Sequence, residues 1–114
     1  SPNFQRSEFT CNHCGELPHD PPQKLLDLLE DIRAEFDKPV VITSGWRCKT
    51  HNANVGGAKN SKHLEAIAAD IQVSGVDPVS VHAYCSARMS GWGGLGKYAT
   101  FTHVDVREDG PARW

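Results

Sequence analysis

The chain has 114 residues and a mass of 12.5 kDa, which is enough for one compact domain spanning residues 1–114. Its 12 Lys and Arg residues nearly balance 14 Asp and Glu residues, and the formal net charge of -2 argues against nucleic acid as a partner. No run approaches the roughly 18 consecutive apolar residues of a membrane span, so we expect a soluble protein. No signal peptide is visible, and export stays undetermined from this end.

The first half of the chain is expected to hold one helix and one strand. Residues 1–22 are rich in turn-forming residues and are expected to form loops. Apolar residues then recur at helical spacing, two prolines suit the first turn, and the helix is expected to end near Asp37. These apolar residues are Leu25, Leu28, Leu29, Ile32 and Phe36. The β-branched run 40–43 is typical of a buried strand, and residues 44–62, with turn formers such as Asn60, are expected to be loop.

The second half of the chain is expected to hold two strands and one helix. Residues 68–73 are predicted to form a strand. Asp77 and Pro78 supply the N-cap and the first-turn proline of a second helix. The glycine-rich residues 90–96 lead to a further strand, which alternates over 101–107. The order of these elements indicates an α+β fold, with a small antiparallel sheet and helices packed on it.

Four cysteines are more than a reduced cytosolic domain of this size usually carries. They permit two disulfides in three pairings, or four unrelated thiols. The spacing of Cys11 and Cys14 also suits half of a structural zinc site, which Cys48 could complete. Cys85 shares a predicted helix face with Val81 and is interpreted as a core residue.

Two histidines and two aspartates form the most informative pattern in the chain. His63 and Asp70 lie seven residues apart, at the end of the polar loop and within the predicted strand. His103 and Asp105 stand at i and i+2 of another strand, so they point to the same face. Two imidazoles and one carboxylate are the donors that a catalytic zinc accepts, with a fourth position left open.

Several short polar motifs accompany these residues. They are Ser44-Gly45-Trp46-Arg47, His51-Asn52, Val55-Gly56-Gly57-Ala58, Asn60-Ser61-Lys62-His63, Ala68-Ala69-Asp70-Ile71 and Phe101-Thr102-His103-Val104-Asp105-Val106-Arg107. Together they closely resemble the M15 peptidases, and within them the zinc D-Ala-D-Ala carboxypeptidase type of bacteria and phage lysis proteins. The resemblance runs from about Phe9 to Trp114. It implies the fold shared by D,D-peptidases and the hedgehog signalling domain.

The resemblance also implies roles for single residues. One catalytic zinc would be held by His63, Asp70 and His103. Arg47 stands where these enzymes place an arginine that faces the scissile carbonyl, and a fixed guanidinium there would stabilise the charge that hydrolysis drives onto the oxygen. Ser61 and Trp46, which belong to the same motifs, are expected to contact the substrate.

The sequence departs from the family pattern at two positions. Many relatives carry a glutamate, the general base, three residues before the last zinc histidine, where this chain has Thr100. Asp105 is the nearest carboxylate in sequence, so it is our candidate for the base. Its competing role is to hold His103 or Arg107 by hydrogen bonds. Ala66 replaces a glycine common in relatives, which affects loop geometry more than chemistry.

The implied function is a zinc metallopeptidase that hydrolyses D-Ala-D-Ala or related bonds of peptidoglycan stem peptides, as a carboxypeptidase or as an endopeptidase. We expect a monomer that works outside the cytosol, in the periplasm or cell wall, or as a phage lysis protein. In such a setting disulfides among Cys11, Cys14 and Cys48 are favoured over a second, structural zinc. The alternatives are a zinc-binding module without catalysis and a cell-wall-binding module whose stacking surfaces are Trp46, Trp92 and Trp114.

Overall fold

The computed structural model describes residues 2–58 and 61–114, in which three α-helices, two short 3-10 helices and five strands are formed. The helices are α1 (Gln23–Phe36), α2 (Lys49–Asn54) and α3 (Pro78–Arg88), with the 3-10 helices η1 (Arg6–Phe9) and η2 (Lys62–Glu65). The strands are β1 (Val40–Ser44), β2 (Ala68–Val73), β3 (Gly94–Lys97), β4 (Thr102–Asp105) and β5 (Ala112–Arg113). The two predicted helices and the three predicted strands are therefore confirmed.

The five strands form one sheet in the order β1-β2-β4-β3-β5. Neighbouring strands are antiparallel except for β3 and β5, which are parallel. The chain reverses once between β3 and β4 and again after β4, so β5 runs in the direction of β3. The predicted α+β class is confirmed, and the sheet is mixed rather than purely antiparallel.

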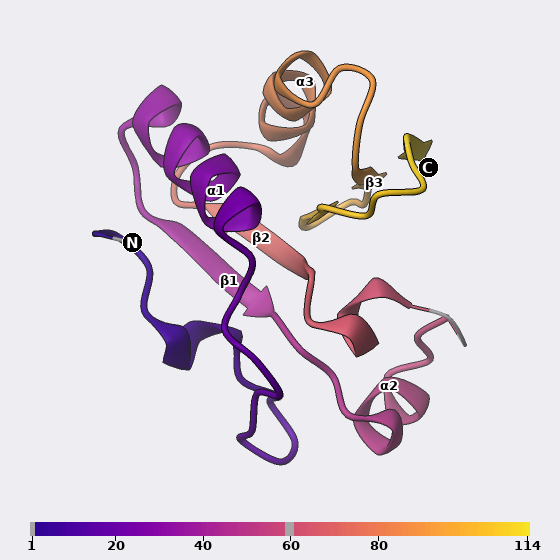
Figure 1. Ribbon diagram of the computed structural model, residues 1–114. Helices are drawn as coiled ribbons and strands as arrows, with labels where there is room; N and C mark the ends of the chain where they lie inside the picture. The colour runs from indigo at the N-terminus through magenta and orange to yellow at the C-terminus, as the bar shows by residue number, and fades with distance from the viewer. Residues whose placement is uncertain (1, 59–60) are drawn as a thin grey trace.

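Helices α1 and α3 cover one face of the sheet, and the hydrophobic core lies between (Figure 1). The four apolar residues Leu25, Leu28, Leu29 and Ile32 of α1 are fully buried, as their spacing predicted. Phe36, at the end of α1, packs edge-on against Tyr84 of α3. Cys85 is buried in the same core, where burial raises the pKa of its thiol to about 12. No helix in residues 2–58 and 61–114 is long and apolar enough to cross a bilayer.

The other face of the sheet carries the polar residues singled out from the sequence. Asp70 of β2 pairs directly with His103 of β4, and Ala68 pairs with Asp105. Directly paired residues point to the same face, and so do residues two apart on one strand. His103, Asp70 and Asp105 therefore share the face opposite the helices, while Ala69 and Val104 point into the core.

Three stretches differ from the sequence predictions. The expected loop 44–62 contains α2, whose first turn is capped by the Cys48 sulfur, which accepts from the backbone N–H of His51 at 3.4 Å. Asn60, a predicted turn residue of that loop, lies outside the described residues. The glycine-rich stretch 90–96 contains the start of β3, and β5 was not predicted.

Glycines are required in β3 because its neighbours crowd it on the polar face. Gly94 pairs with Asp105, and Gly96 pairs with His103. A Cβ at Gly94 would overlap the Asp105 carboxylate, and one at Gly96 would lie 2.6 Å from the Trp114 indole. Glycine has low strand propensity, so the sequence did not predict β3. These same glycines make room for side chains of the polar site.

Candidate metal centre

His63 is positioned on the polar face by η2 and by the segment that contains Gly45. It lies in η2, where the Ser61 hydroxyl accepts from its backbone N–H at 3.2 Å, and its side chain is buried. The ring Nδ1 donates to the backbone carbonyl of Gly45 at 2.6 Å. A carbonyl oxygen can only accept, so Nδ1 carries a proton and Nε2 is the ring nitrogen that can bind a metal ion. Nε2 lies 3.0 Å from Asp70 Oδ1.

His103 has the same arrangement with its ring nitrogens exchanged. Its Nε2 donates to Asp105 Oδ2 at 2.7 Å, and its Nδ1 lies 3.0 Å from Asp70 Oδ1. Asp105 is itself fully buried and forms an ion pair with Arg107, whose Nε and Nη2 donate to its two oxygens at 2.8 and 2.7 Å. Asp105 therefore holds Nε2 of His103 as a donor and leaves Nδ1 as the ring nitrogen that can bind a metal ion beside Asp70.

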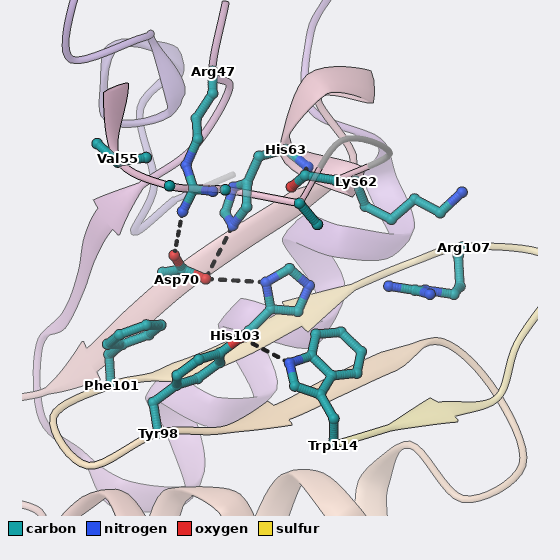
Figure 2. Close-up of a pocket in the computed structure, with 14 residues that line it drawn as sticks. Arg47, Val55, Lys62, His63, Asp70, Tyr98, Phe101, His103, Arg107 and Trp114 are labelled. Carbon is teal, nitrogen blue, oxygen red and sulfur yellow. Dashed lines mark hydrogen bonds and ion pairs between the residues drawn. The ribbon is translucent and has the colours of Figure 1, made fainter. Parts of the chain in front are cut away.

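Asp70 lies between the two histidines and one arginine (Figure 2). Both imidazoles approach Oδ1, and the Nη2 of Arg47 donates to Oδ2 at 3.0 Å. The Arg47 side chain is also hydrogen-bonded to Ser44 and Asn52, so its guanidinium has a fixed orientation. Burial would raise the pKa of Asp70, but the hydrogen bonds with His103 and His63 lower it to about 2.

This geometry fits a bound cation. Two imidazole nitrogens and one carboxylate oxygen converge on the same point. The imidazoles can hydrogen-bond to Asp70 only where they carry a proton, so the arrangement requires positive charge between its members, from protons or from a bound cation. The pKa of His103 accordingly rises: burial acts to lower it, and the carboxylates of Asp105 and Asp70 outweigh burial. The donors around a tetrahedral zinc lie roughly 3.3 Å from one another, close to the 3.0 Å seen between each imidazole nitrogen and Asp70 Oδ1. The three residues thus supply the donor set of a zinc site with an open side.

The open side faces a cavity of about 440 Å³. Arg47, Ser61, His63, Asp70 and His103 all line it, so the structure brings five of the predicted site residues together. A further wall is aromatic and consists of Tyr98, Phe101 and Trp114. Of these, only Trp114 was expected from the sequence to contact a ligand, as a stacking surface of the alternative cell-wall-binding module. Tyr98 stacks on Phe101, and its hydroxyl accepts from the Trp114 indole N–H at 2.7 Å (Figure 2).

Trp46 and Asp105, both predicted site residues, lie outside this cavity. The Trp46 indole N–H donates to the carbonyl of Leu64 at 3.2 Å, and the ring lines a separate hollow beside Leu17. Trp46 thus supports η2 and does not reach the aromatic wall. Asp105 lies behind His103, with both oxygens engaged and no exposed surface, so the geometry favours its role in holding His103 and Arg107 over the base role. Thr100 also lies away from the cavity.

A second cluster of donors lies on the N-terminal side of the chain. The sulfurs of Cys11, Cys14 and Cys48 lie within 4.8 Å of one another, and all are free thiols together with Cys85. The disulfides favoured by the sequence are therefore not formed in this structure. Ala66, the other departure from the family pattern, has a positive φ of 57°, a conformation that glycine adopts more readily.

The chain belongs to the peptidase M15 family, whose profile, described as Peptidase M15, matches residues 2–105. That match covers nearly the whole chain and includes all three candidate metal ligands. The chain is also similar to the zinc D-Ala-D-Ala carboxypeptidase of Streptomyces albus G, with 51% identity over 35 residues. This match covers 31% of the chain and 14% of the length of the carboxypeptidase.

Proposed function

We propose that the protein is a zinc metallopeptidase that cleaves D-Ala-D-Ala or related D-amino-acid bonds in peptidoglycan stem peptides. The observation that carries the proposal is the convergence of His63, Asp70 and His103 in an open cavity. In each imidazole, the ring nitrogen that does not face Asp70 donates to a fixed acceptor oxygen. Membership of the M15 family and the similarity to a zinc D-Ala-D-Ala carboxypeptidase support it. Such a substrate lies outside the cytosol, which is where we propose that the protein acts.

His63, Asp70 and His103 would hold the zinc ion. When bound, zinc supplies Lewis-acid polarisation of the scissile carbonyl and lowers the pKa of a water molecule. Arg47 lines the same cavity beside Asp70, with its side chain 15% exposed. Its guanidinium can donate to the carbonyl oxygen as negative charge develops there, and its hydrogen bonds to Ser44 and Asn52 fix its orientation before the substrate binds.

The cavity suits the end of a stem peptide. Its lining includes Lys62 and Arg107, which are ion-paired with Glu65 and Asp105 and retain further N–H groups that can attract a terminal carboxylate. The aromatic wall offers Trp114 and Phe101 to the apolar parts of the peptide, and the Ser61 hydroxyl can donate to a peptide carbonyl. Cationic side chains placed where a terminal carboxylate could bind favour the carboxypeptidase over the endopeptidase reaction.

One observation favours the alternative of a zinc-binding module without catalysis. Among the described residues that line the cavity, Asp70 is the only carboxylate, and it is already committed as a ligand. His51 and His82, two further side chains that could accept a proton, do not line the cavity either. A module of this kind would bind zinc and peptide and release no product.

Digestion of purified peptidoglycan separates these possibilities. The zinc-loaded protein is incubated with peptidoglycan and with a soluble stem peptide, and the products are identified by mass spectrometry. Loss of one alanine from the stem peptide supports the carboxypeptidase, and separation of cross-linked peptides supports the endopeptidase. His63→Ala serves as the inactive control. Zinc binding with no change in either substrate would leave the non-catalytic module.

A further inference from the structure

The three cysteines near the N-terminus come from two distant segments of the chain. Cys11 and Cys14 lie between η1 and α1, and Cys48 directly follows Arg47, at the start of α2. Their sulfurs nevertheless meet within 4.8 Å of one another. The two segments are also joined by hydrogen bonds, from Trp46 N–H to the carbonyl of Phe9 at 2.8 Å and from the Asn12 amide to the carbonyl of Thr43 at 2.9 Å. The cluster therefore lies at an established junction of the fold.

The backbone around Cys11 and Cys14 has the shape of a metal-binding turn. The N–H of His13 points at Cys11 Sγ at 3.4 Å, and the N–H of His51 points at Cys48 Sγ at 3.4 Å. The N–H of Gly15, which has a φ of 73°, donates to the carbonyl of Cys11 at 2.8 Å and closes the turn. Backbone N–H groups aimed at sulfur stabilise a thiolate, which is the form that binds a metal.

One imidazole lies beside Cys48, and a second stacks on the first. His13 Nδ1 lies 3.7 Å from Cys48 Sγ, and the His13 ring stacks on that of His51 with 6.1 Å between ring centroids. The order along the chain is Cys-x-x-Cys followed by Cys-x-x-His, a spacing that suits a tetrahedral zinc with three sulfurs and one nitrogen. Zinc–sulfur bonds of about 2.3 Å separate tetrahedral sulfurs by roughly 3.8 Å, within the observed spread.

Disulfide bonds explain this cluster less well than a metal does. Three sulfurs cannot all pair, and the remaining cysteine, Cys85, is buried in the core on α3. One disulfide would leave the third sulfur of the cluster without a partner. A metal ion uses all three sulfurs at once, and it also accounts for the nearby imidazoles.

We propose that Cys11, Cys14 and Cys48, with an imidazole from the His13 and His51 pair, bind a structural zinc ion distinct from the one at the cavity. The ion ties the N-terminal segment to the start of α2, next to the backbone of Arg47, whose N–H donates to the carbonyl of His63. Binding stabilises the folded chain because the four ligands come together only on folding. The proposal does not depend on peptidase activity.

Zinc content per chain, measured by mass spectrometry after dialysis under reducing conditions, tests the proposal. The wild type is expected to hold two zinc ions. Cys48→Ser and His63→Ala are each expected to hold one, and the matched control Cys85→Ala is expected to hold two. The double variant of His13→Asn and His51→Asn is expected to lose at least tenfold in affinity for the second ion. Unchanged affinity in that double variant would refute the histidine ligand.

Cobalt binding and thiol alkylation provide a test that uses no variant of the three cysteines, so the folding of the chain without the structural ion is not in question. Cobalt-loaded His63→Ala is expected to show sulfur-to-cobalt charge-transfer absorption. Zinc is expected to protect three of the four cysteines of the wild type from alkylation in a way that a chelator reverses. A wild type with one zinc ion, without charge-transfer absorption and without protected thiols, would overturn the proposal, as would a mass showing a disulfide in the freshly purified protein. Loss of peptidase activity alone would test only the cavity.

Discussion

Asp105→Asn tests how the site holds His103. Asp105 accepts from His103 Nε2 at 2.7 Å and binds the Arg107 guanidinium through both oxygens, with no exposed surface. Asparagine keeps the shape but retains one acceptor oxygen, so either His103 or Arg107 faces an amide N–H instead. In either orientation His103 loses the carboxylate charge that makes Nδ1 a good ligand, and in one orientation it also loses the acceptor that fixes its tautomer.

The expected cost follows from that lost hydrogen bond. Removing a partner of this kind weakens metal binding by about 10- to 100-fold, or about 1.4 to 2.8 kcal/mol. Leaving a buried donor unpaired should also lower the free energy of unfolding by about 1 to 3 kcal/mol. Zinc affinity is measured by competition with a chelating dye and stability by urea unfolding, with the exposed Asp109→Asn as the matched control.

The variant also separates the two roles weighed for Asp105. As a positioning residue it should show weak zinc binding and should recover most of its activity when zinc is saturating. Wild-type zinc affinity combined with a loss of activity of about 10² to 10⁴ would instead make Asp105 the general base and refute this account of its position.

The remaining predictions concern the arginine, the crowded strand and the core thiol. Arg47→Ala should lower kcat by roughly 10² at saturating zinc, with exposed Arg6→Ala unchanged; equal rates for the two variants in a steady-state assay would remove Arg47 from the reaction. Gly94→Ala should destabilise the protein by about 1 to 3 kcal/mol in urea unfolding and weaken zinc binding, because its Cβ displaces the Asp105 carboxylate, whereas Gly75→Ala should leave zinc affinity unchanged. Burial raises the pKa of Cys85 from 9.0 to about 12, so its contribution to stability is complete below pH 9 and is lost as the pH rises toward 12. The free energy of unfolding of the wild type should therefore fall more steeply between pH 9 and pH 12 than that of Cys85→Ala. An equal fall in both proteins would contradict the burial effect.

The sequence predicted the elements that have strong periodicity. The apolar stripe of α1, the β-branched run of β1 and the capping pair Asp77-Pro78 of α3 each carry a local signal, and each element formed where expected. The shared face of His103 and Asp105 also followed from strand alternation alone. Local rules were sufficient for these features because each depends on neighbours in sequence.

The features that sequence reasoning missed depend on contacts between distant segments. Strand β3 contains Gly94 and Gly96, which have low strand propensity and are required by Asp105 of β4 and by Trp114, which follows β5. Trp46 belongs to the same motif as Arg47, yet its indole points away from the cavity and contacts η2. Alternation fixed the face of Asp105 but not its distance from the cavity, because the His103 ring lies between Asp105 and Asp70. The paired glycines opposite His103 and Asp105 were the one available signal that bulky side chains lie over β3.

Zinc-dependent release of free D-alanine from a stem peptide ending in D-Ala-D-Ala tests the central claim most directly. The protein is stripped of metal, titrated with zinc and assayed at each step, with His103→Ala beside the wild type. The account predicts that D-alanine release rises with zinc occupancy of the site formed by His63, Asp70 and His103, and that His103→Ala releases none. Full zinc occupancy of that site without D-alanine release, or equal release by His103→Ala, would contradict it.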